Sequence, residues 1–227
     1  MRRCVLFGLL MLGAVSITAA QDPIKTLPKN YWVEFENPWI QVIHARYRPH
    51  EKVPVHDHST APTLYVYLSD SGPVEFKHGG AESFNLTRPA LKAGQMRVSP
   101  GRIETHQVEN LGDLQSDFLR VELKTLPIGL RNFNKRIPAA DAAFWQEAHP
   151  EKVEFESPRM RVTRFGVAAG QHAALRGEKT QTAWIVVTAE GATIAGQAAH
   201  AGQTWASPTL DVTGGTKNVE LVRIEVN

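Results

Sequence analysis

Three histidines have the types and the spacing of a transition-metal site. His56 and His58 stand two residues apart in the run 52–58. Because a strand points residues i and i+2 to the same side, this spacing aims two imidazoles at one point. His106 follows the turn residues 99–101 in a separate segment and is the candidate third ligand. Three neutral imidazoles suit Zn, Fe, Ni, Cu or Mn, so we expect one divalent transition metal.

A carboxylate and two aromatic residues complete the candidate site. Glu104 lies two residues before His106, and on a strand the two share a face. It is the candidate catalytic residue, as an added ligand or a general base, and a surface carboxylate is the alternative. Tyr65 and Tyr67 share a strand face and would line a pocket or belong to the core. For the histidines, the alternative is three separate side chains satisfied by ordinary hydrogen bonds.

The elements that must position these residues are strands. Short runs that favour β-structure are separated by turn residues, at 39–48, 64–68, 73–76, 118–123 and 219–226. This pattern predicts an all-β sandwich or barrel. The exception is the segment 139–148, which stands between Pro138 and Pro150 and predicts a short helix.

The chain repeats itself. Residues 33–38 (VEFENP) return as residues 153–158 (VEFESP), an offset of 120. Residues 93–95 (AGQ) return as residues 201–203, an offset of 108. We therefore expect two equivalent units. Their bounds are a first unit with the metal site at 21–126, a connector with a short helix at 127–150, and a second unit at 151–227.

The second unit lacks the metal-binding residues. With these offsets, Arg176 and Glu178 stand where His56 and His58 do, and Gly214 replaces His106. Arg176 and Glu178 would form a salt bridge or bind a small polar ligand. The second unit is expected to be a structural or dimerising partner of the first.

The histidine spacing resembles the cupin family. Its first motif is a glycine, five residues, His-x-His, three or four residues, a glutamate, six residues and a glycine. Its second is a glycine, five residues, Pro-x-Gly, two residues, a histidine, three residues and an asparagine. The chain supplies His56 and His58 for the first motif, and the residues of the second are Gly94, Pro100, Gly101, His106 and Asn110.

The departures from these motifs are local. His50 replaces the opening glycine of the first motif, and Pro62 or Thr63 stands where the glutamate belongs. In the second motif Pro100 and Gly101 are adjacent, and more residues separate them from the histidine. Neither Pro62 nor Thr63 is a good metal ligand, so the expected inner shell is three histidines.

The resemblance implies a fold and a range of functions. The fold would be two cupin-type β-barrels, each a double-stranded β-helix, joined by a short helical connector. Cupin sites include oxygenases with Fe, Cu or Ni, isomerases or lyases with Zn or Mn, and binding proteins without turnover. We expect a metal-dependent, dioxygenase-like enzyme for a small organic substrate, because three histidines leave room for oxygen and substrate. The alternatives are a non-catalytic module that binds or senses a small ligand, and a purely structural metal. Many cupins are dimers, so a homodimer is a further expectation; the alternative is that the two units of one chain already pair with each other.

The first twenty residues have the pattern of a secretory signal peptide. Basic Arg2 and Arg3 precede an apolar run at 5–17, and small residues precede a cleavage point after Ala20. A retained membrane anchor is the alternative. The product would be periplasmic or secreted, and Cys4, the only cysteine, would leave with the signal. Basic and acidic side chains would then balance at 23 each. Scattered charges and no second long apolar run predict neither a nucleic-acid partner nor a membrane-embedded product.

Overall fold

The structure, a computed structural model, describes residues 22–79, 83–102 and 104–227. Its strands before residue 140 are β1 (Tyr31–Glu36), β2 (Ile40–Tyr47), β3 (Lys52–His58), β4 (Thr63–Tyr67), β5 (Val74–His78), β6 (Phe84–Arg88), β7 (Met96–Ser99), β8 (Glu104–Asn110), β9 (Ser116–Leu123) and β10 (Lys135–Ile137). The later strands are β11 (Glu151–Glu156), β12 (Met160–Val167), β13 (His172–Arg176), β14 (Thr182–Thr188), β15 (Thr193–Ile194), β16 (Gln197–Ala198), β17 (Thr204–Ala206), β18 (Thr209–Thr213) and β19 (Val219–Val226). The short helices are α1 (Pro23–Thr26) and the 3-10 helix η1 (Phe144–Gln146). The all-β prediction is confirmed, and β2, β4, β5, β9 and β19 fall on the runs expected to be strands.

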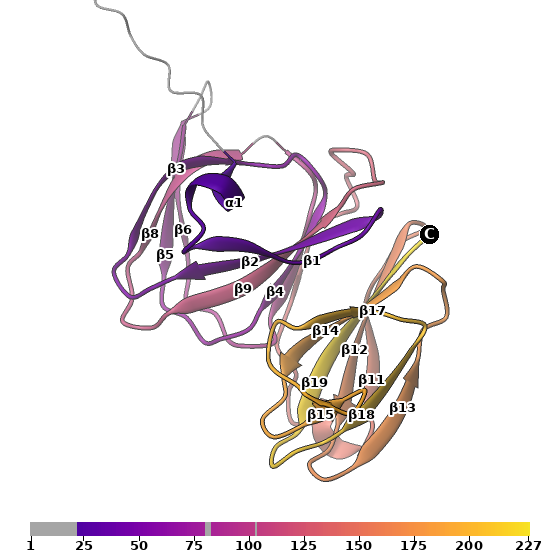
Figure 1. The fold of residues 1–227 in the computed structure, drawn as a ribbon. Coiled ribbons are helices and arrows are strands. Elements are labelled where there is room, and N and C mark those ends of the chain that lie inside the picture. The colour runs from indigo at the N-terminus through magenta and orange to yellow at the C-terminus, as the bar shows by residue number, and fades with distance from the viewer. Residues whose placement is uncertain (1–21, 80–82, 103) are drawn as a thin grey trace, which may run out of the picture.

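The sheet order of the first half returns in the second (Figure 1). A six-stranded sheet, β1-β2-β9-β4-β7-β10, accompanies a four-stranded sheet, β3-β8-β5-β6. In the second half, β11-β12-β19-β14-β17 accompanies β13-β18-β15-β16. The repeat extends to a bulge between Val33 and Phe35, which recurs between Val153 and Phe155 at the same offset of 120. The repeat seen in the sequence is therefore a repeat of strand order.

The expectation of closed barrels is wrong. Across the described residues, the hydrogen-bonded ladders form four separate sheets, and no ladder joins the smaller sheet of a half to its larger one. Each half is thus a pair of open sheets. A sandwich buries the inner faces of both sheets without hydrogen bonds at the edges, because side chains alone fill the space between them.

The expected helical connector is also wrong. Segment 127–150 contains the edge strand β10, and the part predicted as a helix holds only the three-residue helix η1. Trp145 of η1 packs against Gly166, where an added Cβ would lie 2.5 Å from the indole ring. Pro138 and Pro150 limit the segment to fewer residues than an isolated helix needs, so this tertiary contact decides its conformation.

The largest apolar core joins the two halves. It includes Leu64 and Val121 from the first half and Ile185 and Ile224 from the second, all fully buried. A smaller cluster lies within each half. A chain of 227 residues therefore holds together through a core that neither half completes alone.

Two related contacts cross between the halves. His44 lies against Gly202, where an added Cβ would be 3.1 Å from the imidazole Cε1. Arg164, at the position equivalent to His44, donates to the carbonyl of Gly94 at 2.9 Å. Gly94 and Gly202 both have positive φ, at 80° and 89°. The repeated glycines thus allow buried polar side chains of the opposite half to approach the backbone closely.

The proposed signal peptide, residues 1–20, lies outside the described residues. Of the helices that are described, none is long and apolar enough to cross a membrane.

Candidate metal centre

The three predicted histidines meet between the sheets of the first half. β3 and β8 pair antiparallel, and His56 lies directly opposite His106. His58 follows two residues later on the same face, as its spacing predicts. One ring nitrogen from each of the three lies within 4.8 Å of the others, and all three side chains are buried. The structure therefore brings together a three-histidine site.

A bulge in β3 fixes the orientation of His56. The register shifts by one residue between Val53 and His56, which leaves Pro54 and Val55 exposed between two buried positions. The carbonyl of Pro54 lies 2.7 Å from His56 Nδ1 and accepts its hydrogen bond. The other ring nitrogen, Nε2, lies 3.1 Å from His58 Nε2. Such a backbone contact selects the tautomer whose other nitrogen is available to a metal.

His106 is the strongest sign that these residues fit a metal ion. Among the described residues, neither of its buried ring nitrogens has a hydrogen-bond partner. Leaving a buried polar group unpaired costs about 1–3 kcal/mol. Burial, with His56 nearby, lowers the pKa of His106 to about 3, and burial lowers the pKa of His58 well below its usual range. A divalent transition metal would satisfy one of the two unpaired nitrogens, and neutral imidazoles are the form that binds it.

Tyr31 belongs to the site and was missed by the sequence analysis. Its hydroxyl lies 2.9 Å from His56 Nε2 and 2.7 Å from the Tyr47 hydroxyl, and the side chain is fully buried. Burial raises the pKa of Tyr31 well above its usual range, so the phenol keeps its proton. No local motif signals this contact, because Tyr31 is on the other sheet, 25 residues before His56.

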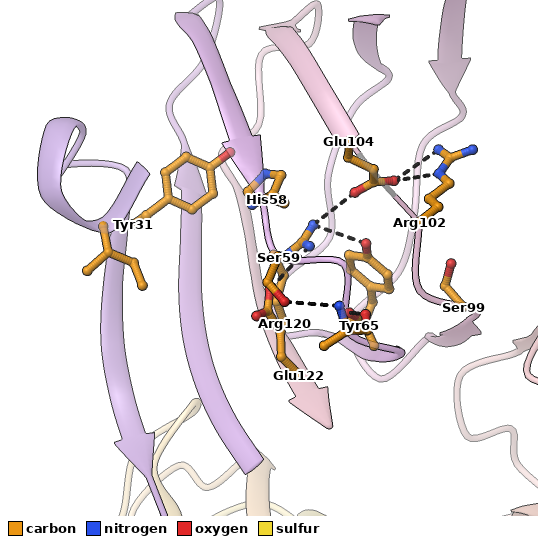
Figure 2. A network of polar contacts seen from close by, with 12 residues as sticks. Tyr31, His58, Ser59, Tyr65, Ser99, Arg102, Glu104, Arg120 and Glu122 are labelled. Atoms are coloured by element: carbon orange, nitrogen blue, oxygen red, sulfur yellow. Dashed lines mark hydrogen bonds and ion pairs between the residues drawn. The ribbon is translucent and has the colours of Figure 1, made fainter. Parts of the chain in front are cut away.

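Glu104 lies beside the histidines in a network of ion pairs (Figure 2). It pairs opposite His58 on the neighbouring strand, and its carboxylate contacts Arg102 at 2.9 Å and Arg120 at 3.5 Å. Arg120 also contacts Glu122 at 3.3 Å and donates to the Tyr65 hydroxyl at 3.0 Å. Although burial alone would raise its pKa, Arg120 and other positive groups lower the pKa of Glu104 to about 2. A carboxylate with so low a pKa is a weak base, and its catalytic role stays a prediction.

Two departures from the cupin motifs are explained by the backbone. His50 has a φ of 57°, in the left-handed region that glycine favours, and its equivalent Gly170 has a φ of 70°. His50 is exposed and contacts Asp113, away from the metal site. Thr63, one of the two candidates for the missing glutamate position, donates its hydroxyl to the carbonyl of Ala61. Neither replacement supplies a fourth ligand.

In the second half, leucines occupy the positions of the histidines. β13 and β18 pair without the extra residue of β3, so Leu175 lies opposite Leu210 where His56 lies opposite His106. Both leucines pack in the apolar cluster of that half. Arg176, equated with His56 by sequence offset, is therefore shifted by one residue, and Glu178 pairs with Arg161 at 2.5 Å instead.

One of the three histidines, His106, lines a cavity of about 340 Å³ whose walls come from both sheets of the first half. His106 and Glu104 line it from β8, and Tyr65 and Tyr67 line it from β4. The pocket role foreseen for the two tyrosines is thus confirmed, and both are also buried. Its volume is in the range of small-molecule sites.

Comparison with solved structures finds the same fold in proteins of low sequence identity. A bacterial pirin from Escherichia coli, solved in complex with nickel(II), is 14% identical with a TM-score of 0.58, and the match covers 86% of this chain and 90% of the pirin. A variant of salicylate 1,2-dioxygenase from Pseudoaminobacter salicylatoxidans, in complex with gentisate, is 14% identical with a TM-score of 0.52, covering 82% and 68%. Quercetin 2,3-dioxygenase from Acinetobacter baumannii is 13% identical with a TM-score of 0.52, covering 84% and 75%.

These similar structures are cupin-fold proteins, and the chain has a cupin fold. No protein-family model matches the sequence, and none of the curated proteins matches it. The comparisons therefore show the fold, and the chemistry rests on the residues of the site.

Proposed function

We propose that the protein is a metal-dependent enzyme of the cupin fold that acts on a small organic substrate, with dioxygenase-like chemistry. The observation that carries the proposal is the meeting of His56, His58 and His106 beside a cavity, with His106 lacking any partner among the described residues. Two of the structures with the same fold are dioxygenases, and a third holds nickel.

Each residue of the site has a separate role in the proposed chemistry. The three histidines would hold a divalent transition metal, which would supply redox or Lewis-acid chemistry toward oxygen and the substrate. Pro54 orients His56 through its Nδ1. Tyr31 holds a proton at its hydroxyl beside His56 Nε2, and Glu104 keeps a negative charge between two arginines. The apolar and aromatic lining of the cavity would exclude water from the bound substrate.

Oxygen consumption tests the proposal. Protein loaded separately with Fe, Ni, Cu or Mn would be mixed with phenolic and diketone substrates, and uptake would be followed with an oxygen electrode. We expect turnover with at least one metal, and its loss in His58→Ala. His50→Ala removes an exposed imidazole outside the site and should keep full activity. Bound metal without turnover across these substrates would contradict the enzyme.

A non-catalytic binding or sensing role is the second candidate. The observation that favours it is the position of Glu104, whose carboxylate is already held by Arg102 and Arg120. A site without a free acid or base can capture a ligand but has fewer ways to move a proton. Metal-dependent ligand binding with no oxygen uptake would support this role.

We also propose that the protein is exported to the periplasm or secreted, and that it forms a homodimer. The pattern of residues 1–20 supports export, and the frequency of dimers among cupins supports the second statement. After expression with its own N-terminus, the exported protein should begin at Gln21 by N-terminal sequencing. Sedimentation should give twice the mass of one chain. Recovery of the uncleaved protein in the cytoplasm, or of a monomer at micromolar concentration, would contradict the respective statement.

The division of the chain is a further part of the proposal. Residues 21–126 would carry the site, 127–150 would connect, and 151–227 would support the first half. The leucine pair of the second half supports this assignment, because it leaves no metal ligands at the equivalent positions.

A further inference from the structure

The cavity beside the metal site is lined by an unusual number of arginines. Among its lining residues are five arginines and one carboxylate, Glu104. The arginines come from both sheets and are Arg88, Arg97, Arg102, Arg120 and Arg136. A cavity that holds so many fixed cations attracts a negatively charged ligand.

Four of the lining residues form a row across neighbouring strands. In the pairing register, Arg136 of β10 lies opposite Arg97 of β7, Arg97 opposite Tyr65 of β4, and Tyr65 opposite Arg120 of β9. The guanidinium of Arg97 lies over the Tyr65 ring, 4.4 Å from its centre. Like charges directly opposite each other on paired strands are destabilising. An anion bound between Arg97 and Arg136 would relieve this repulsion.

The arginines differ in whether the protein already neutralises them. Arg102 and Arg120 form ion pairs with Glu104. Arg97 and Arg136 form no ion pair with any described residue. The buried Nε of Arg97 also has no hydrogen-bond partner among the described residues. Arg88 has no carboxylate partner among the described residues either, and its buried Nε also lacks a hydrogen-bond partner there. Its guanidinium nevertheless donates to Ser116 at 2.8 Å and lies over three aromatic rings. Arg97 and Arg136 are thus the pair available to a ligand.

We propose that this cavity binds a small aromatic carboxylate, whose carboxylate group is held by Arg97 and Arg136 and whose ring lies among the aromatic side chains of the pocket. The proposal rests on the proposed function, because it names the substrate class of the same site. A planar guanidinium matches a carboxylate with two parallel hydrogen bonds. The walls suit a flat apolar ring, since Tyr65, Tyr67, Phe76 and Phe118 line them.

The same cavity connects this anion site with the histidines. His106 and Glu104 line it together with Arg97 and Arg136. Glu104 lies opposite His58 on the paired strand, and its carboxylate is already held by Arg102 and Arg120. A ligand whose carboxylate is held by Arg97 and Arg136 would therefore lie in the same cavity as His106.

Binding of matched acids and amides tests the proposal. Benzoate, cinnamate and 3-phenylpropionate would be titrated into the full chain by calorimetry, each beside its neutral amide and beside acetate. The titrations would be made with metal-loaded protein and with protein stripped by a chelator. We expect at least one aromatic acid to bind tenfold or more tightly than its amide and than acetate. No binding by any of the three acids, or equal binding by their amides, would overturn the proposal. Equal binding by acetate would overturn the aromatic part.

Arginine variants locate the binding. Arg136→Gln changes an exposed side chain and should weaken the aromatic acid about tenfold, and Arg97→Gln should weaken it at least as much. Arg131→Gln makes the same charge change at an exposed position outside the cavity and should leave binding unchanged. Unchanged binding in Arg136→Gln and in folded Arg97→Gln would overturn the assignment.

The outcomes separate this inference from the proposed function. Acid binding with no bound metal would retain the anion site and reject the metal-dependent enzyme. Bound metal without a preference for acids over amides would reject the anion site and leave the metal-dependent enzyme standing.

Discussion

Tyr31 links the metal site to the neighbouring sheet. Its hydroxyl lies between Tyr47 and His56 Nε2, the same nitrogen that would bind a metal. In the absence of a metal the phenol satisfies this nitrogen, and a bound metal would replace it there. His56 Nε2 therefore has a partner in both states, the Tyr31 hydroxyl without metal and the ion with it. Neither state leaves this buried nitrogen unpaired.

Replacement of Tyr31 by phenylalanine tests this exchange. Tyr31→Phe keeps the ring beside His56 and His58 but removes the hydroxyl. We expect the metal-free variant to lose about 1–3 kcal/mol of unfolding free energy, because two buried partners lose a hydrogen bond. The loss should be smaller with metal bound, and metal affinity should be equal or higher. Thermal unfolding with and without metal measures both, and weaker metal binding would show that the hydroxyl helps to hold the ion.

Asp117 gives a pH-dependent contribution to stability. Burial alone would raise its pKa, but the neighbouring His44 and Arg46 lower it below the ordinary value of 3.8. A carboxylate whose pKa is lower in the folded state stabilises the fold above its unfolded pKa, and this contribution disappears as the pH falls through the folded value. Asp117→Asn should therefore lose about 2 kcal/mol at pH 7 and progressively less below about pH 4. Urea unfolding at both pH values measures the difference. The exposed Asp113→Asn is the control, and a loss that does not shrink in acid would refute the assignment.

At the scale of elements, strand β3 decides where the ligands point. Its alternation places His56 and His58 inward and Asp57 between them toward the outer face. Its bulge supplies the Pro54 carbonyl for His56. The paired strand β8 then needs to contribute only one histidine.

Deletion of Asp57 would separate the two ligands. Adjacent residues of a strand point to opposite faces, so the deletion should abolish metal binding while the rest of the sheet still forms. Asp57→Ala keeps the spacing and should keep the metal, although it loses the contact with Thr105. Metal content of the purified variants, with circular dichroism for the fold, measures this. Full metal content after the deletion would mean that the spacing does not position the ligands.

The sequence predicted what local patterns determine, and missed what depends on pairing between distant strands. The spacing of His56 and His58 determines that both side chains point to the same face, and β19 falls on a run of residues that favour β-structure. Tyr31 could not be found, because only the folded sheets bring it to His56. The extra residue in β3 shifted the comparison of the two halves, so Leu175 was overlooked. The helix expected at 139–148 failed because the packing of Trp145 outweighs local propensity.

At the scale of the whole molecule, the shared core couples the halves. Fully buried residues of both halves form its largest apolar cluster, and Arg164 of the second half bonds to the backbone of the first. If one half unfolded alone, the apolar surface of the other half would become exposed to water. This exposure costs about 25 cal/mol per Å² of apolar area, so the remaining half would lose much of its stability. We therefore expect the halves to unfold together.

Calorimetry tests the coupling. Residues 22–227 should show a single heat-absorption peak, with a calorimetric enthalpy equal to the van't Hoff enthalpy. Metal should shift this whole peak upward, although the ligands lie only in the first half. Two resolved peaks, of which only one moves with metal, would show that the halves are independent.

The metal content of purified protein, measured by mass spectrometry of the elements, tests whether the three histidines hold an ion. We expect about one divalent transition metal per chain, and almost none in His56→Ala, His58→Ala or His106→Ala. His50→Ala, which removes an exposed histidine, should retain the metal. A wild-type protein without metal after growth and refolding with each candidate ion, or full occupancy in His106→Ala, would contradict the three-histidine centre.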